Sequence, residues 1–199
     1  MSVPLNAHET HVEEIIRDPT ITYRNSISIE TPLEIWEMGL DNIYLVGRLW
    51  GIYGFKPAYH VTRIGSGIHV VDPTGITGDV WPAGRSSRSR LFYGRGRVNH
   101  IALPGFFNAD GVIIFEWRPT PTMLLIDVKI FLLGNNWISR AVMRLISGPL
   151  IRLIEHRFDS NLKDLRTIIR DIVHETAMVR NRLDDALNIE FEKAFPLKK

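Results

Sequence analysis

The chain has 199 residues, of which 45% are hydrophobic and 23% are charged, a composition that suits a globular protein with a sizeable core. Its 24 Lys and Arg residues against 22 Asp and Glu leave a net charge of +2, without the basic excess typical of nucleic-acid-binding proteins, so no nucleic-acid partner is expected. The chain contains no cysteine, which excludes disulfides, cysteine-ligated zinc, iron–sulfur clusters and a thiol nucleophile.

The N-terminal residues 1–19 are expected to form an extension outside the main domain. Residues 8–17, "HETHVEEIIR", favour a short helix that ends at Asp18. His8 and His11 are three residues apart, whereas the zinc-protease motif needs a spacing of four and a third ligand. We therefore expect no metal at this segment.

The sequence also indicates where the protein resides. The N-terminus lacks the apolar region of a secretory signal, and no run of 18 apolar residues is long enough to span a membrane. The apolar segment 43–55 is short and is interrupted by Arg48, so we interpret it as a buried helix. Together with the missing cysteines, these features predict a cytoplasmic protein.

A strand and two helices are expected next. Residues 21–30 alternate between apolar and polar side chains, which predicts a strand with one buried face. "TPLE" at 31–34 is typical of a capping box with proline at the first helical position, so a helix should begin here and continue to Leu40. A second helix is expected from Asn42 to about Tyr53.

Residues 58–133 are expected to form an antiparallel meander. The segments "AYHVTRI" and "GIHVVD" flank a "GSG" turn and predict a hairpin, and "SRSRLFYGRGRV", "GVIIFEW" and "MLLIDVKIFLL" predict further strands. The connecting segments are too short for crossover helices, which favours antiparallel pairing.

The C-terminal part predicts long amphipathic helices. From Gly148 to Ile172, apolar residues recur at intervals of three and four, which predicts a helix about 38 Å long that can lie across a whole sheet. The segment 176–195 carries apolar residues at intervals of four and predicts a second helix, or a continuation after a bend near 174–176. Its apolar stripe is a possible homodimer surface.

This order of elements resembles the SRPBCC superfamily, which groups START-like, birch-pollen-allergen-like and polyketide-cyclase-like domains. The resemblance rests on the strand and capped helix at 27–41, on the meander, and on "PLIRLIEHRFDSNLKDLRTII" at 149–169. It covers residues 20–175 and leaves the extensions 1–19 and 176–199 unexplained. It implies an α+β helix-grip fold, in which a curved sheet wraps around the long helix and encloses a cavity for a hydrophobic or amphipathic small molecule.

The arginine-rich stretch 84–97, "GRSSRSRLFYGRGR", holds several candidate catalytic residues. In a strand, Arg90 shares a face with Phe92, while Tyr93 and Arg95 share the opposite face. One set could place guanidinium groups in the cavity to bind a carboxylate, an enolate or a phosphate, and the alternative is a solvated strand paired with acidic neighbours. Its glycines are interpreted as bulges or as points where a ligand or helix approaches closely.

Candidate acid/base groups lie on other strands. His60 could act as an acid or base in a dry cavity, and Glu116 stands on an otherwise apolar strand face. Asp127 and Lys129 are expected on the convex side. The predicted ligand contacts, for which core packing is the alternative, are Trp50, Tyr53, Phe55, His69, Phe92 and Trp117.

Two functions stay open at this point. The first is an enzyme without a cofactor, of the cyclase, aromatase or isomerase kind, that acts on a hydrophobic, polyketide- or terpenoid-like substrate. In it, Tyr93 with Arg90 or Arg95 polarises a carbonyl, and His60 or Glu116 moves a proton. The second is a non-catalytic lipid or quinone carrier. A polar cavity would favour the enzyme, and an apolar cavity would favour the carrier. The mixture of His, Arg, Tyr and Glu along the sheet slightly favours the enzyme. A structural protein that dimerises through 176–195 is a third alternative.

Overall fold

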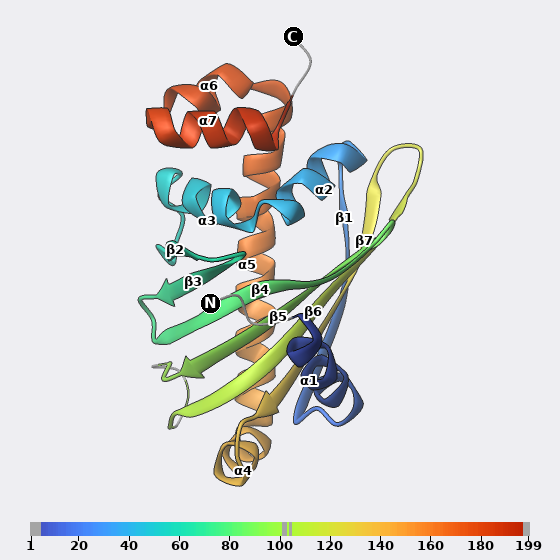
Figure 1. The fold of residues 1–199 in the computed structure, drawn as a ribbon, viewed down its shortest axis with the longest axis vertical. Coiled ribbons are helices and arrows are strands. Elements are labelled where there is room, and N and C mark those ends of the chain that lie inside the picture. The colour runs from blue at the N-terminus through green and yellow to red at the C-terminus, as the bar shows by residue number, and fades with distance from the viewer. Residues whose placement is uncertain (1–4, 101–102, 104, 197–199) are drawn as a thin grey trace.

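The computed structural model describes residues 5–100, 103 and 105–196, with the side chains of residues 5–9 left out of the description. Within this part of the chain, one antiparallel sheet of seven strands has the order β1-β7-β6-β5-β4-β3-β2 (Figure 1). The strands are β1 (Ile21–Ile29), β2 (His60–Ile64), β3 (Gly67–Asp72), β4 (Ile76–Ser86), β5 (Ser89–Val98), β6 (Phe107–Pro119) and β7 (Leu124–Gly134). The antiparallel meander is confirmed, and β1 closes it by pairing with β7.

Strand β4 is the part of the sheet that the sequence did not predict as a separate strand. The arginine-rich stretch is divided by a turn at residues 87–88, so that Arg85 lies near the end of β4 while Arg90 lies in β5. The register between β4 and β5 shifts at Pro82 and Gly84. A proline and a bulge interrupt the alternation that identifies a strand.

Helices α2 (Leu33–Asp41) and α3 (Ile43–Ile52) follow β1 as predicted. The predicted capping box is wrong, because Pro32 occupies the position before the helix and no side chain among the described residues caps it. The hydroxyl of Thr31 instead donates to the carbonyl oxygen of Pro32 at 3.3 Å.

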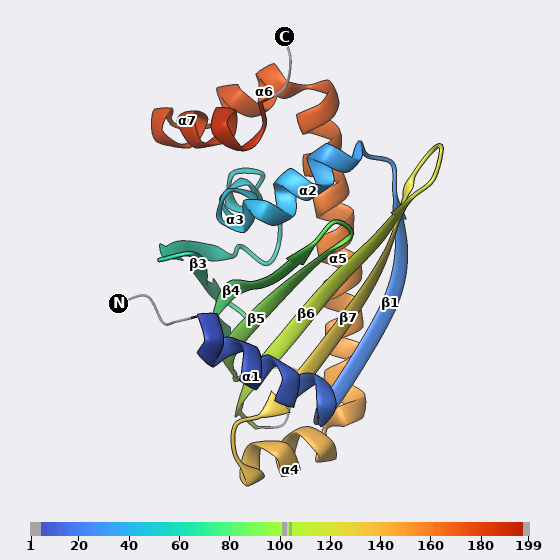
Figure 2. The same cartoon turned by 45° about the vertical axis from the view of Figure 1, so that its right-hand side comes forward.

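Helix α5 (Ser147–His174) is the predicted long helix, and its 28 residues span about 42 Å. It crosses one face of the curved sheet (Figures 1 and 2). Helix α4 (Trp137–Leu145), which was not predicted, precedes it, and the side chain of Asn136 caps α4 by accepting from the Ser139 amide at 2.8 Å. No helix in the described residues is long and apolar enough to cross a membrane.

The N-terminal extension is helix α1 (Leu5–Arg17), which packs on the sheet face opposite to α5 (Figure 2). Its residues Val12 and Ile15 are buried against Tyr93, Val112 and Phe131 of the sheet. Both faces of the sheet are therefore covered over part of its area.

The C-terminal extension forms two short helices, α6 (Thr176–Asn181) and α7 (Asp185–Ala194). The bend after His174 was expected, but a second break at 182–184 was not, and Asp184 caps α7 there. The apolar side chains Leu183, Leu187 and Phe191 belong to the same hydrophobic cluster as α3 and α5. The stripe predicted as a possible dimer surface is thus buried within the chain.

Candidate functional site

A cavity of about 630 Å³ lies between the concave face of the sheet and α5. Apolar side chains from both layers line it, including Phe92 and Val98 of β5, Ile113 of β6, and Leu150, Phe158 and Leu162 of α5. Trp36 of α2 and Trp50 of α3 also form part of its wall. A molecule inside this space would exchange water for an almost entirely hydrocarbon surface, which is favourable for apolar ligands.

The floor of the cavity is a block of very small residues on three neighbouring strands. Gly78 of β4 pairs with Gly96 of β5, which in turn pairs with Ala109 of β6, and Gly94 pairs with Gly111. All five line the cavity. A longer side chain at Gly94, where an added Cβ would have room, would enter the space beneath α5, whereas a Cβ at Gly78 or Gly96 would lie 2.6 or 2.8 Å from a backbone oxygen of the neighbouring strand. Gly94 therefore keeps part of the cavity open, and Gly78 and Gly96 allow the strands to approach closely. The predicted bulge within β5 is absent from its described pairing.

A second cavity of about 230 Å³ adjoins the first behind the two tryptophans. Its wall shares several residues with the larger cavity, among them Trp36, Trp50 and Tyr59, and is otherwise formed by α2, α3, α5, strands β2 and β3, and Phe195. The C-terminal segment thus contributes one side chain to this space.

Polar groups in the wall gather around α5 and are mostly paired with each other. Tyr59 donates its hydroxyl proton to Asn161 at 3.1 Å. Arg157 donates to Thr74 at 2.6 Å and lies 3.5 Å from the buried carboxylate of Asp72. These contacts satisfy much of the hydrogen-bonding capacity of the side chains that meet the cavity.

His100 joins this group from the loop between β5 and β6. Its Nε2 accepts a hydrogen bond from Arg157 at 3.2 Å. Burial lowers the pKa of His100 below its ordinary value, and the nearby positive charge of Arg157 lowers it further. Burial likewise raises the pKa of the Tyr59 hydroxyl. Both shifts favour neutral side chains at this end of the cavity.

Three buried donors at the cavity wall lack a partner among the described residues. They are the indole nitrogens of Trp36 and Trp50 and the Nε of Arg157. The three nitrogens are themselves shielded from the cavity space, although other atoms of the same side chains line it. A buried donor without an acceptor is costly, so a shift of the wall that brings one of them to a ligand oxygen would be favourable.

Of the predicted ligand contacts, Trp50 and Phe92 line the cavity. Phe55 lies behind Trp50, with ring centres 5.7 Å apart. Tyr53 donates its hydroxyl proton to Asp171 at 3.0 Å, and burial together with this bond raises its pKa to about 12. Trp117 is buried beside Trp36 in the core. These last three therefore support the wall but do not form it.

Arg90 points to the concave side but is tied to the end of α2. Its Nε and Nη2 donate to the two carboxylate oxygens of Asp41 at 2.6 and 3.1 Å, and Nη1 donates to the carbonyl oxygens of Ser86 and Ser89. Its guanidinium also lies 5.2 Å from the ring centre of Trp117. With its donors used in this way, Arg90 joins α2 to β5 and is not part of the cavity wall.

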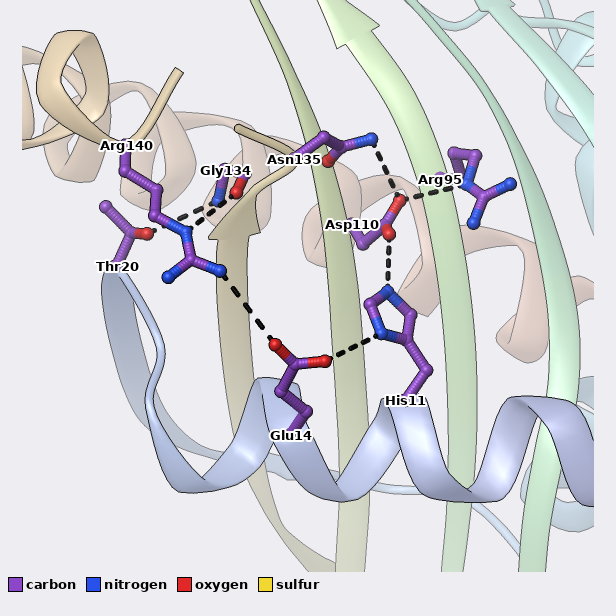
Figure 3. A network of polar contacts seen from close by, with 8 residues as sticks. All are labelled: His11, Glu14, Thr20, Arg95, Asp110, Gly134, Asn135 and Arg140. Carbon is purple, nitrogen blue, oxygen red and sulfur yellow. Dashed lines mark hydrogen bonds and ion pairs between the residues drawn. The ribbon is translucent and has the colours of Figure 1, made fainter. Parts of the chain in front are cut away.

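Tyr93 and Arg95 have their side chains on the convex face, which corrects their expected place in the cavity. Tyr93 is buried under α1. Arg95 donates through Nε to Asp110 at 3.1 Å, and the other oxygen of Asp110 lies 2.6 Å from Nε2 of His11 on α1 (Figure 3). The network continues through Glu14 to Arg140 of α4. These contacts hold α1 against the convex face of the sheet.

The expected acid/base residues are also placed outside the cavity. Glu116 lies on the convex face and accepts a hydrogen bond from Lys129 at 2.8 Å. His60 is exposed on the edge strand β2, and His69 pairs with Asp79 at 2.5 Å in a half-exposed position. The prediction that Glu116 is an internal acid is therefore corrected, whereas the convex placement of Asp127 and Lys129 is as expected.

The sequence did not identify the residues that shape this site most. Tyr59 lies about a hundred residues from Arg157 and Asn161, and only the fold brings it to them. The clearest available signal was the spacing of glycines in β5, which was interpreted partly as a close approach to a ligand.

No family model and no curated protein matches the chain. A comparison with solved structures does find proteins of similar fold. A conserved protein from Geobacillus kaustophilus is 17% identical with a TM-score of 0.52, and the alignment covers 76% of this chain and 96% of that one. A START superfamily protein from Mycobacterium smegmatis is 10% identical (TM-score 0.46, coverage 76% and 98%). Ara h 8.0201 is 6% identical (TM-score 0.47, coverage 77% and 97%).

These identities concern the fold alone. The order of the strands, the long helix across the concave face and the similarity to the Geobacillus structure together define an α+β helix-grip protein. The α+β helix-grip fold that the sequence resemblance implied is confirmed, whereas membership of the SRPBCC superfamily stays a prediction.

Proposed function

We propose that the protein binds an elongated apolar small molecule in the cavity between sheet and helix and acts as its carrier. The observation that supports this most is the volume of about 630 Å³ above a floor of glycines. Ligand pockets in proteins commonly enclose about 300–1,000 Å³ and are mostly apolar. Leaving such a volume empty costs stability, so a sequence that places glycines there favours occupancy by another molecule.

The unpartnered donors indicate which polar group the ligand carries. Trp36, Trp50 and Arg157 each have a buried N–H without an acceptor among the described residues, and a ligand oxygen would reach it after a shift of the cavity wall. A carbonyl or carboxylate oxygen would match these donors, whereas a ligand whose only polar groups are donors would leave them unpaired. We therefore infer an apolar ligand with at least one oxygen acceptor.

The placement of the polar side chains favours a carrier over an enzyme. Tyr93, Arg95 and Glu116 have their side chains outside the cavity, and Arg90 is fully engaged with Asp41 and backbone oxygens. Catalysis by groups that do not reach the substrate is not possible, because proton transfer requires hydrogen-bond distance.

A second candidate function is the cofactor-free transformation of the ligand, of the isomerase or cyclase kind. The observation that favours it is the cluster of Asp72, Arg157 and His100 beside the Tyr59–Asn161 pair. Arg157 lines the cavity, and its guanidinium can stabilise negative charge on a ligand oxygen, whereas His100 is not part of the wall and could act only through Arg157. Recovery of a chemically altered ligand after incubation would favour this function over transport.

Gly94→Leu is the variant that tests occupancy of the cavity. A Cβ at Gly94 would come no closer than 3.4 Å to its neighbours, whereas at Gly78 and Gly96 it would lie 2.6 and 2.8 Å from backbone oxygens. The variant should therefore fold, fill the cavity and weaken the binding of a long-chain ketone at least about tenfold, measured by displacement of a fluorescent apolar probe.

Gly148→Leu on the outside of α5 is the matched control, because no neighbour lies within 4 Å of its added Cβ. It should bind the ketone as the wild type does. Ketone binding that is equally strong in the folded Gly94→Leu variant would contradict the proposed site.

A further inference from the structure

Helix α4 exposes an apolar surface that the chain itself does not cover. Trp137 is 77% exposed, Leu145 is 86% exposed and Ile138 is 55% exposed, whereas Met143 and Ser139 on the other side of the helix are buried. At 100° per residue, the three exposed residues and Ala141 fall on one side of the helix. Large apolar side chains gathered in this way mark an interaction surface.

The charges around this surface are positive. Arg144 is exposed on the same helix, and Arg140 is held by the Gly134 carbonyl and lies 3.9 Å from Glu14. From residue 128 to residue 154 the sequence contains four basic residues and no aspartate or glutamate. The apolar surface of α4 therefore stands in a segment that favours a negatively charged partner.

The position of α4 connects this surface with the cavity. The helix lies at one end of the molecule, and α6 and α7 lie at the other (Figures 1 and 2). On its inner side, Met143 packs in one hydrophobic cluster with Phe107 and Leu150. Phe107 and Leu150 also line the cavity. The inner side of α4 thus packs against side chains that form the wall of the ligand space.

We propose that α4 docks on the surface of an anionic lipid bilayer. Tryptophan prefers the boundary between headgroups and acyl chains, and Leu145 and Ile138 would enter the outer acyl region while the arginines meet lipid phosphates. The docking itself does not require the proposed ligand, although it would bring the cavity to the place where an apolar ligand dissolves.

A second copy of the chain fits this surface less well. A symmetric dimer through α4 would bring Arg144 of both copies together, and the segment 128–154 offers no carboxylate to pair with them. A helix of nine residues is also small for a stable interface, which usually buries about 1,200 Å² or more.

Vesicle flotation tests the proposal with the full chain. We expect binding to vesicles of equal parts phosphatidylcholine and phosphatidylglycerol, weaker binding at high salt, and little binding to phosphatidylcholine alone. The double variant Trp137→Glu/Leu145→Glu should lose binding at least about tenfold. Arg144→Glu should lose it about fivefold or more.

Two variants serve as matched controls. Ile189→Glu changes an equally exposed apolar residue on α7, and Arg88→Glu makes the same charge change in the β4–β5 turn. Both should bind anionic vesicles as the wild type does. The proposal is overturned if the wild type does not bind these vesicles, if the α4 variants bind unchanged, or if sedimentation shows a dimer that the α4 variants abolish.

Discussion

At the scale of single residues, the glycines of β4, β5 and β6 are the most unusual feature of the cavity wall. Gly78, Gly94, Gly96 and Gly111 stand at neighbouring positions on three strands, directly below α5. Glycine in the interior of a strand weakens the strand, because it adds backbone entropy to the unfolded chain and packs against nothing. Gly94 has room for a side chain, so its glycine is consistent with a space kept open for a ligand, whereas Gly78 and Gly96 are explained by the close approach of neighbouring backbone.

Trp50→Phe tests whether an indole N–H recognises the ligand. Phenylalanine keeps most of the apolar wall but removes the donor, so the variant should bind a long-chain ketone about fivefold more weakly. Binding of an alkane of equal length should change much less. Displacement of a fluorescent probe measures both affinities, and Trp137→Phe, at an exposed position, is the control. An equal loss for ketone and alkane would mean that Trp50 acts only through packing.

His100→Gln tests the polar cluster through its pH dependence. Burial and Arg157 lower the pKa of His100 below 6.5 in the folded protein. Below pH 6.5 the unfolded chain therefore binds this proton more readily than the folded chain, and the free energy of unfolding falls as the pH falls. Urea unfolding should show a shallower fall for His100→Gln than for the wild type.

The exposed His174 is the control for this titration. His174→Gln should retain the slope of the wild type below pH 6.5. An unchanged slope in His100→Gln would show that the cluster around Arg157 does not hold a neutral imidazole.

The sequence could not predict which face of each strand is concave or which charged side chains pair with each other. The alternation in β5 correctly placed Tyr93 and Arg95 on the face opposite Phe92. It did not tell which face is concave, because α1 buries part of the convex face and makes both faces apolar. The pairing of Glu116 with Lys129 was unpredicted for the same reason, since it depends on the register between β6 and β7.

At the scale of elements, periodic segments were predicted well and irregular ones were not. Strand β1 alternates cleanly, and α5 repeats apolar residues at helical spacing over most of its length, so both follow directly from the pattern. Strand β4 carries Pro82 and a register shift, so it shows no single period, and α4 was not predicted because its amphipathic pattern covers only nine residues.

Asp41→Asn tests the link between α2 and β5. The side chain of Arg90 is 4% exposed, so removing the charge of its partner leaves a buried cation poorly compensated. We expect the free energy of unfolding to fall by about 1–3 kcal/mol, measured by urea unfolding. Arg85 also lies 3.1 Å from Asp41 but is 68% exposed, so Arg85→Ala should change stability by no more than about 0.5 kcal/mol. Equal losses in the two variants would contradict the link.

At the scale of the whole molecule, the two extensions complete the helix-grip domain on opposite sides. Helix α1 covers the convex face, and α6 and α7 pack against α3 and α5 near the smaller cavity. The family resemblance predicted the central domain and left these segments unexplained, because their burial depends on contacts with distant parts of the chain. The sheet and α5 enclose the larger cavity, and α4 lies at one end of it.

Native mass spectrometry of the purified protein tests the central claim most directly, because it weighs the chain together with anything held in the cavity. We expect the wild type to carry an added mass, or to take up a long-chain ketone as a one-to-one complex, and we expect Gly94→Leu to show neither. A wild type that stays at the mass of the bare chain with and without the ketone would contradict the claim that this cavity holds an apolar guest.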